Sequence, residues 1–318
     1  MTDVSTKNRL HRMRGSVYAP LVMTFAASLI YAAAGTGTAA DVPAPDTQSQ
    51  QTPAAGPGLA VGRLVSDDDR CQRLERYADL NHCNMRGMDL TGVDLYGADL
   101  TGADLTSANL YGARLRKANL SYTNLGYTDL TIADLSRANL TNAGLDHAVA
   151  SSVNLTRANL TGAHLPGAAL AYANLTGANL NHLNLREIDL SNADLSGADL
   201  TGADLTSACL REARLKGSNL YYTNLGYAIL TRADLSSADL TNSGLDYAGL
   251  TSANLDHANL TGANLNHASL YYANLTGANL TSANLTNAWL TDATWTNGHI
   301  CGQGSWGECR EVEGLSKI

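Results

Sequence analysis

Phenylalanine and the common catalytic motifs are nearly absent from this chain. Among 318 residues one phenylalanine occurs, Phe25, and it precedes the region of repeats. The sequence contains no GxSxG, no HExxH and no phosphate-binding loop, so the hydrolase, zinc peptidase and P-loop classes that depend on these motifs are excluded. Small residues, Leu, Asn, Asp and Thr fill most of the chain instead. This composition is typical of a solenoid, and length then says little about the number of globular domains.

Positive charge is also scarce. Lys and Arg number 21 against 29 Asp and Glu, a net charge of −8. Removal of residues 1–40, which hold four basic residues and Asp3, leaves 17 basic and 28 acidic residues and a net charge of −11. Nucleic-acid binding favours a basic surface. We therefore predict no nucleic-acid partner.

The first forty residues predict export. Four basic residues precede an apolar stretch at residues 17–34, and small residues continue through Ala40, which is typical of a signal peptide cleaved near that point. An uncleaved membrane anchor at 17–34 is the alternative, because about 18 apolar residues is the lower limit for crossing a bilayer. Pro20 and the small residues that follow the apolar stretch favour cleavage. Both interpretations place the rest of the chain outside the cytoplasm, secreted or in the cell envelope.

Residues 41–65 predict a disordered linker. Most of the segment is rich in Pro, Gln, Ala and Gly and has no periodic apolar face. Such a segment cannot bury enough apolar surface to order itself. We expect it to tether the region that follows.

A five-residue repeat dominates residues 78–297. Counting by fives from Leu80 to Leu290 gives 43 positions, of which 41 are Leu, the exceptions being Met85 and Ala150. Ala usually stands two residues before each Leu, Asp or Asn one before, Thr or Ser often one after, and Gly commonly next. A period of five fits neither an α-helix nor a simple strand. We predict that the chain turns every five residues, with Gly at many corners supplying positive φ, and that four repeats close a square coil around the Leu side chains.

The repeat also carries a family resemblance. The pattern of a small residue, Asp or Asn, Leu, then two variable residues resembles the pentapeptide repeat family, here in an exported bacterial protein. The resemblance implies an all-β solenoid, a right-handed quadrilateral parallel β-helix. Residues 78–297 would form about eleven coils, about 4.8 Å apart. Residues 103–127 match residues 203–227 at an offset of 100, which predicts two five-coil blocks.

Both ends of the repeats are predicted to be capped, because a bare solenoid end exposes Leu and unpaired backbone. Residues 66–77 predict a short capping helix with Ser66 as N-cap and Asp69 completing a capping box. Residues 298–318 predict a C-terminal cap containing a disulfide loop.

Cysteine positions agree with export. Cys71 with Cys83, and Cys301 with Cys309, form one candidate disulfide at each cap. Cys209 is left alone on the coil surface. No His lies at ligand-like spacing beside either pair, so a structural role is favoured over a metal site.

Residues 20 apart should stack on one face, which yields two kinds of candidate binding surface. The basic ladder consists of Lys117, Arg137 and Arg157, and it lies next to Arg116 and Arg114. The aromatic patches consist of Tyr122, Tyr127, His147, Tyr222, Tyr227, Tyr247 and His267. Aromatic patches suit contacts with sugars or proteins, although Tyr also packs well on any sheet face. A short basic ladder is often a solvated surface with no binding role.

No catalytic, metal or cofactor site is predicted. Asp89, Asp94, Asp99 and Asp104 fall on consecutive sides of one coil, where they are expected to bond the local backbone rather than face one substrate. No two His residues lie 20 apart, so none can stack as ligands in adjacent coils.

These observations favour a noncatalytic exported scaffold that contacts a protein or a cell-envelope polymer. The first alternative is an acidic DNA mimic that inhibits gyrase, as some members of the resembled family do. Export, the cap cysteines and the lack of central Phe count against it. The second is an exported polysaccharide-active enzyme, which would need long loops where the register of Leu continues without insertion.

Overall fold

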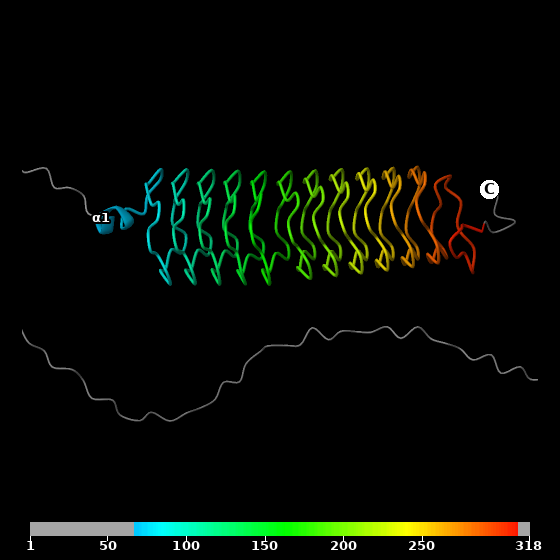
Figure 1. Cartoon of the computed structure of the whole chain (residues 1–318), viewed down its shortest axis with the longest axis horizontal. Coiled ribbons are helices and arrows are strands. Elements are labelled where there is room, and N and C mark those ends of the chain that lie inside the picture. Colours follow the sequence, from blue (N-terminus) through cyan, green and yellow to red (C-terminus); the bar gives the residue numbers. More distant parts are fainter. Residues whose placement is uncertain (1–66, 311–318) are drawn as a thin grey trace, which may run out of the picture. The chain divides into compact units, whose positions relative to one another are not determined.

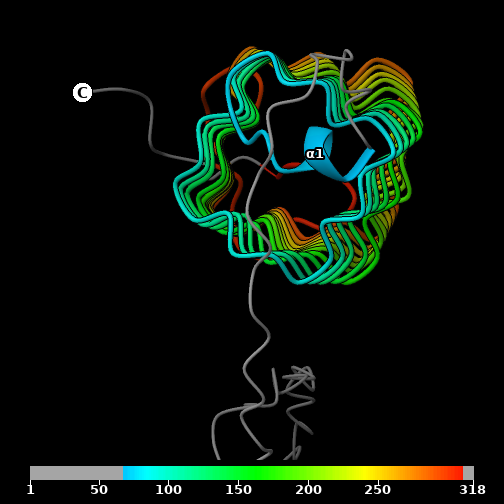
Figure 2. The same ribbon diagram turned by 90° about the vertical axis from the view of Figure 1, so that its left-hand side faces the viewer.

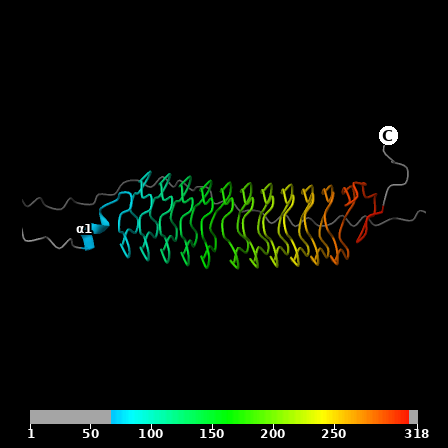
Figure 3. The same cartoon turned by 90° about the horizontal axis from the view of Figure 1, so that it is seen from above.

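The computed structural model describes residues 67–310, so the predicted export signal, the linker and Ser66 lie outside the described residues. Within that range the one helix is α1, Asp67–Cys71, and the chain then forms a solenoid whose coils follow one another along its axis (Figures 1 and 3). No helix within residues 67–310 combines the length and apolarity needed to cross a membrane.

Each pentapeptide makes one corner of the coil, and the corners superpose when the solenoid is viewed along its axis (Figure 2). The N–H of Ala103 donates to the carbonyl of Leu100 at 2.9 Å. Gly102, the second residue inside this turn, has a φ of +64°, as in a type II turn. The same position has positive φ throughout, and 31 residues other than glycine adopt it. Glycine supplies the positive φ at 13 corners, as expected, but the corner does not require glycine.

Four pentapeptides complete one coil, as predicted, because the parallel bridges join residues 20 apart. Asp99 pairs with Asn119, for example, and the series runs from Asp79 to Thr294. The N–H of Leu100 donates to the carbonyl of Asn119 at 2.7 Å, and the N–H of Asn119 donates to Ala98 at 2.9 Å. Each side contributes one bridging residue, so the described residues form isolated bridges rather than longer strands.

The interior is a ladder of leucines, which confirms the inward orientation expected from the period. Leu100 and Leu200 are fully buried, as are nearly all their equivalents, and the Ala two residues earlier is buried with each. Where Ala150 interrupts the ladder, Val153 stands at the neighbouring inward position, while the second block has Leu250 and Ala253. The larger and smaller side chains have exchanged places, and the N–H of Ala150 still donates to the next coil at 2.9 Å.

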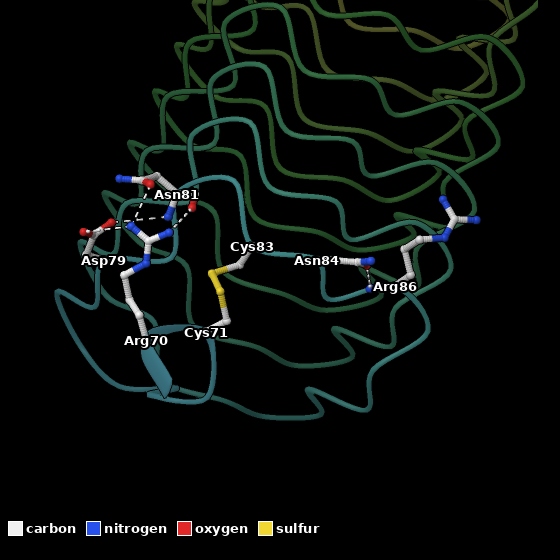
Figure 4. The surroundings of a disulfide bond; sticks show 7 residues. All are labelled: Arg70, Cys71, Asp79, Asn81, Cys83, Asn84 and Arg86. Carbon is white, nitrogen blue, oxygen red and sulfur yellow. Dashed lines mark hydrogen bonds and ion pairs between the residues drawn. A yellow bond between two sulfur atoms is a disulfide. The ribbon is translucent and has the colours of Figure 1, made fainter. Parts of the chain in front are cut away.

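Helix α1 is shorter than the predicted span of 66–77. The N–H of Tyr77 already donates to the carbonyl of Tyr96 in the next coil at 2.9 Å, so the first corner replaces the end of the helix. A disulfide joins Cys71 to Cys83, with 5.5 Å between their Cα atoms (Figure 4). Arg70 reaches from α1 to the first coil and donates to the side-chain and backbone oxygens of Asn81 at 3.0 Å each.

The C-terminal end closes by antiparallel pairing. Trp289 bridges Trp306, and Thr294 bridges Ile300. A second disulfide joins Cys301 to Cys309 across 5.0 Å between Cα atoms. The chain thus folds back over the last corners, which replaces the parallel pairing that a further coil would supply.

A seam interrupts the ladder where the two blocks meet. Five N–H groups at this level make no backbone hydrogen bond to the adjoining coil within the described residues, although their equivalents 100 residues later all do. The coils are visibly further apart at this level in Figure 1. These five N–H groups belong to Gly162, Leu165, Gly167, Asn184 and Asp189.

Two bulky residues account for the seam. Leu183 and Ile188 occupy the inward position that is usually Ala, and Ala283 and Ala288 stand there in the second block. Both are 3 % exposed, so their larger side chains must fit between coils. Their turn hydrogen bonds, to the carbonyls of Leu180 and Leu185, stretch to 3.4 Å. Packed interiors transmit such extra volume to the backbone.

The seam predicts uneven protection of backbone amides. The amides of Leu165 and Gly167 are expected to exchange with deuterium faster than those of Leu265 and His267, which occupy the same places in the second block and donate at 2.8 and 2.9 Å. Hydrogen exchange followed by NMR measures this difference within one molecule. Equal protection at the two levels would show that the coils remain paired in solution.

Candidate binding surfaces

The ten predicted binding residues share one backbone position, the second residue within the corner turn. All have φ between 54° and 61°, and nine of the ten are exposed, while His267 is half-buried. Tyr122 and Tyr127 are 65 % and 63 % exposed, respectively. The corner positions form four columns, in which successive members lie 20 residues apart. In the sequence, each corner position is the second residue after a central Leu.

Side chains in a column lean toward the following coil. A Cβ placed on Gly102 would lie 2.6 Å from Nδ1 of His82, and one on Gly202 would lie 2.5 Å from Nδ1 of His182. A corner side chain therefore covers the corner residue one coil later. Glycine at that later position leaves room for the ring, and an aromatic residue there stacks on it.

One column contains both predicted aromatic stacks. The rings of Tyr127 and His147 stack with centroids 5.0 Å apart. In the second block Tyr227 stacks on Tyr247 at 4.9 Å and 1°, and Tyr247 stacks on His267 at 4.7 Å and 8°. The inner ring faces are covered by their neighbours. A partner can reach the ring edges along the stack and the outer faces of the terminal rings.

Tyr122 and Tyr222 lie in the adjacent column and do not join these stacks. Tyr222 meets Tyr221 edge to face with centroids 4.4 Å apart, and the hydrogen bond between them raises the pKa of Tyr221. Among the described residues Tyr122 has no ring partner. Duplicated positions thus carry different local surroundings.

The basic ladder is divided between two environments. The ammonium of Lys117 lies 5.6 Å from the ring centre of Tyr96, and its hydrogen bond lowers the pKa of that phenol. Arg137 and Arg157 instead line a surface depression together with Arg116, which stands one residue earlier in its repeat than they do in theirs. Spacing by 20 identified two members of this set but not the third.

The aspartates are occupied by the backbone, as expected. Thr106 donates its N–H to Oδ1 of Asp104 at 3.0 Å, and Thr91 does the same to Asp89 at 3.1 Å. This is the one N–H in the repeat that neither the turn nor the ladder uses. The hydroxyl of Thr106 and the guanidinium of Arg86 lower the pKa of Asp104. Among the described residues, no three His, Cys, Asp or Glu side chains form a metal-binding group.

Comparison with known proteins identifies the repeat. A family model described as "Pentapeptide repeats" matches eight times, at residues 76–106, 98–137, 133–170, 168–206, 184–220, 208–246, 218–256 and 258–294. No match was found among curated proteins.

Solved structures similar to the chain include those of HetL and QnrB1. HetL, a pentapeptide repeat protein involved in heterocyst differentiation regulation in the cyanobacterium Nostoc sp. strain PCC 7120, is 34 % identical, with 67 % of this chain and 92 % of HetL covered and a TM-score of 0.36. Full-length QnrB1, a plasmid-mediated fluoroquinolone resistance protein, is 18 % identical, with 55 % and 89 % covered and a TM-score of 0.38.

Substitution of Asp104 should separate its hydrogen bond from its charge. Asp104→Ala removes the acceptor for Thr106 and is expected to cost about 1 kcal/mol of unfolding free energy at pH 7, whereas Asp104→Asn retains Oδ1 and should cost less than about 0.5 kcal/mol. Because the folded-state pKa lies below 3.8, the charge stabilises above that value and its contribution is lost as the pH falls through the folded pKa. Urea unfolding at pH 7 and pH 3 measures both effects. Equal losses for the two variants at pH 7 would contradict the acceptor role.

Proposed function

The chain belongs to the pentapeptide repeat family, and from this premise we propose that it is a noncatalytic exported scaffold whose corner columns contact a protein or polymer of the cell envelope. The observation that carries the proposal is the exposed aromatic stacking along one corner. The stack presents ring edges at a regular spacing on a rigid backbone. This arrangement suits binding of a partner and not catalysis.

Exposed aromatic residues on a rigid backbone suit binding. Tyr and Trp are enriched among the residues that dominate binding energy, because they supply large contact areas at low conformational cost. Tyr127 is 63 % exposed and Tyr227 is 56 % exposed, although each stacks on a neighbour. Stacking holds these rings in one orientation before a partner arrives, so little rotamer entropy remains to be lost on binding.

Export is supported by the N-terminal sequence and by the cysteine geometry. Disulfides persist in oxidising compartments, and both predicted pairs are bonded in the structure. Each crosslink ties a cap to the solenoid. Residues 41–65 would then separate the solenoid from a processed end or a membrane anchor.

A second candidate function, inhibition of gyrase by DNA mimicry, is favoured by one observation, the net charge of −11 after residue 40. This candidate requires the protein to be in the cytoplasm. A gyrase supercoiling assay with the purified solenoid tests it, with inhibition at submicromolar concentration as the supporting result.

Cell fractionation of the tagged full-length protein tests export. We expect the solenoid outside the cytoplasm, with Cys209 as the one thiol that reacts with an alkylating reagent before reduction, because the other four cysteines are bonded. Mass spectrometry of the alkylated protein counts the thiols. Cytoplasmic recovery with five reactive thiols would refute the proposal and favour the gyrase candidate.

Capture experiments test the aromatic corner. The double variant Tyr127→Ala/Tyr227→Ala should recover several-fold less cell-envelope material than the wild type. Tyr172→Ala is the matched control, since Tyr172 is equally exposed, has the same backbone position and lies in a different column. Equal recovery by all three proteins would show that the stacked rings do not contribute to binding of cell-envelope material.

A further inference from the structure

A cationic depression of about 330 Å³ opens on the corner column that contains Arg137 and Arg157. Three arginines line it, Arg116, Arg137 and Arg157. The rest of the lining consists of Asn154 and three hydroxyl residues, Ser136, Thr156 and Thr176. Every one of these side chains can donate a hydrogen bond, and none carries a negative charge.

The three arginines are uncompensated. Arg116, Arg137 and Arg157 have no ion-pair partner among the described residues, whereas several other arginines of the solenoid do. Arg186 pairs with Asp204 at 3.2 Å, and Arg232 pairs with Glu212 at 3.4 Å. Like charges on neighbouring strands repel one another. The depression therefore concentrates cations at a site where the solenoid supplies no counterion.

The geometry points to an oxyanion as the missing counterion. We propose that this depression binds phosphate or sulfate groups of a linear polyanion that lies along the corner, parallel to the solenoid axis. Guanidinium groups form paired hydrogen bonds with such oxyanions. The hydroxyls of Thr156 and Thr176 already donate to Asn154 and Asn174, so Ser136 is the lining hydroxyl that can add a donor. Arg137 and Arg157 recur at one per coil, about 4.8 Å apart, so an extended chain of anions matches them better than a single ion. The cell-envelope setting rests on the proposed function, whereas the binding chemistry does not.

The second block lacks this site, which predicts one site per chain. Positions 100 residues later hold Lys216, Ser237 and His257 in place of the three arginines, and Asp256 in place of Thr156. Nδ1 of His257 lies 2.9 Å from a carboxylate oxygen of Asp256, so that corner is self-neutralised when His257 is protonated. The two blocks therefore share the same backbone but differ in the charge of this corner.

Isothermal titration of the purified full chain tests the inference. The probes are inorganic polyphosphate, dextran sulfate and oligothymidylate, matched in charge, in low-salt buffer. Arg137→Gln/Arg157→Gln should weaken binding of polyphosphate or dextran sulfate at least about tenfold. The control Arg186→Gln/Arg232→Gln removes the same two charges elsewhere and should bind like the wild type. Binding should weaken as salt is raised, and circular dichroism checks that both variants remain folded.

Each outcome decides the question. Whichever of polyphosphate and dextran sulfate binds more tightly identifies the oxyanion. Failure of both to bind, equal losses in the two double variants, or tighter binding of oligothymidylate would overturn the proposal. The titration uses purified protein and defined polymers, so a negative export or capture experiment does not affect it. Failure of the titration likewise leaves the proposed scaffold function untouched.

Discussion

The solenoid depends on one backbone constraint, the left-handed residue within each corner turn. That residue lets the Leu carbonyl accept from the amide three residues later, and so turns the chain every five residues. A left-handed conformation costs on the order of 1 to 2 kcal/mol for a residue with a Cβ. Burial of one Leu per corner contributes about 1.5 to 3 kcal/mol, which is enough to offset it. The chain can therefore place almost any side chain at the corner.

This freedom separates the two roles of the repeat. The Leu and Ala positions are confined to the interior, and the Asp or Asn position is occupied by the adjacent backbone amide. The corner is free to vary, and it carries Tyr, His, Lys, Arg, Glu and Ile in different coils. Because each corner side chain leans over the next one, neighbours in a column are coupled. The side chain of one residue sets whether the residue one coil later is covered, stacked or open.

Much of this arrangement was predictable from sequence. The period gave the square coil, the inward Leu ladder and the stacking of Tyr227 on Tyr247, because each follows from spacing alone. The placement of Arg116 next to the basic ladder was also predicted. The direction in which side chains lean was not predictable, so the approach of Lys117 to Tyr96 was missed. Helix α1 was predicted too long because helical propensity does not indicate where the first hydrogen bond between coils forms, here from the N–H of Tyr77. The seam depends on the volumes of Leu183 and Ile188 relative to Ala, and the sequence contains this difference although the period of five does not reveal it.

The copied unit of 100 residues contains a whole number of coils, since bridges join residues 20 apart. Downstream coils consequently keep their rotational setting whenever recombination adds or deletes complete coils. A gain or loss of a single pentapeptide would rotate everything beyond it by a quarter turn and scramble its columns. Insertion or deletion of complete coils can thus change the length of the solenoid without changing the direction in which each corner column faces. Substitutions at the corners can then change the surface chemistry afterwards.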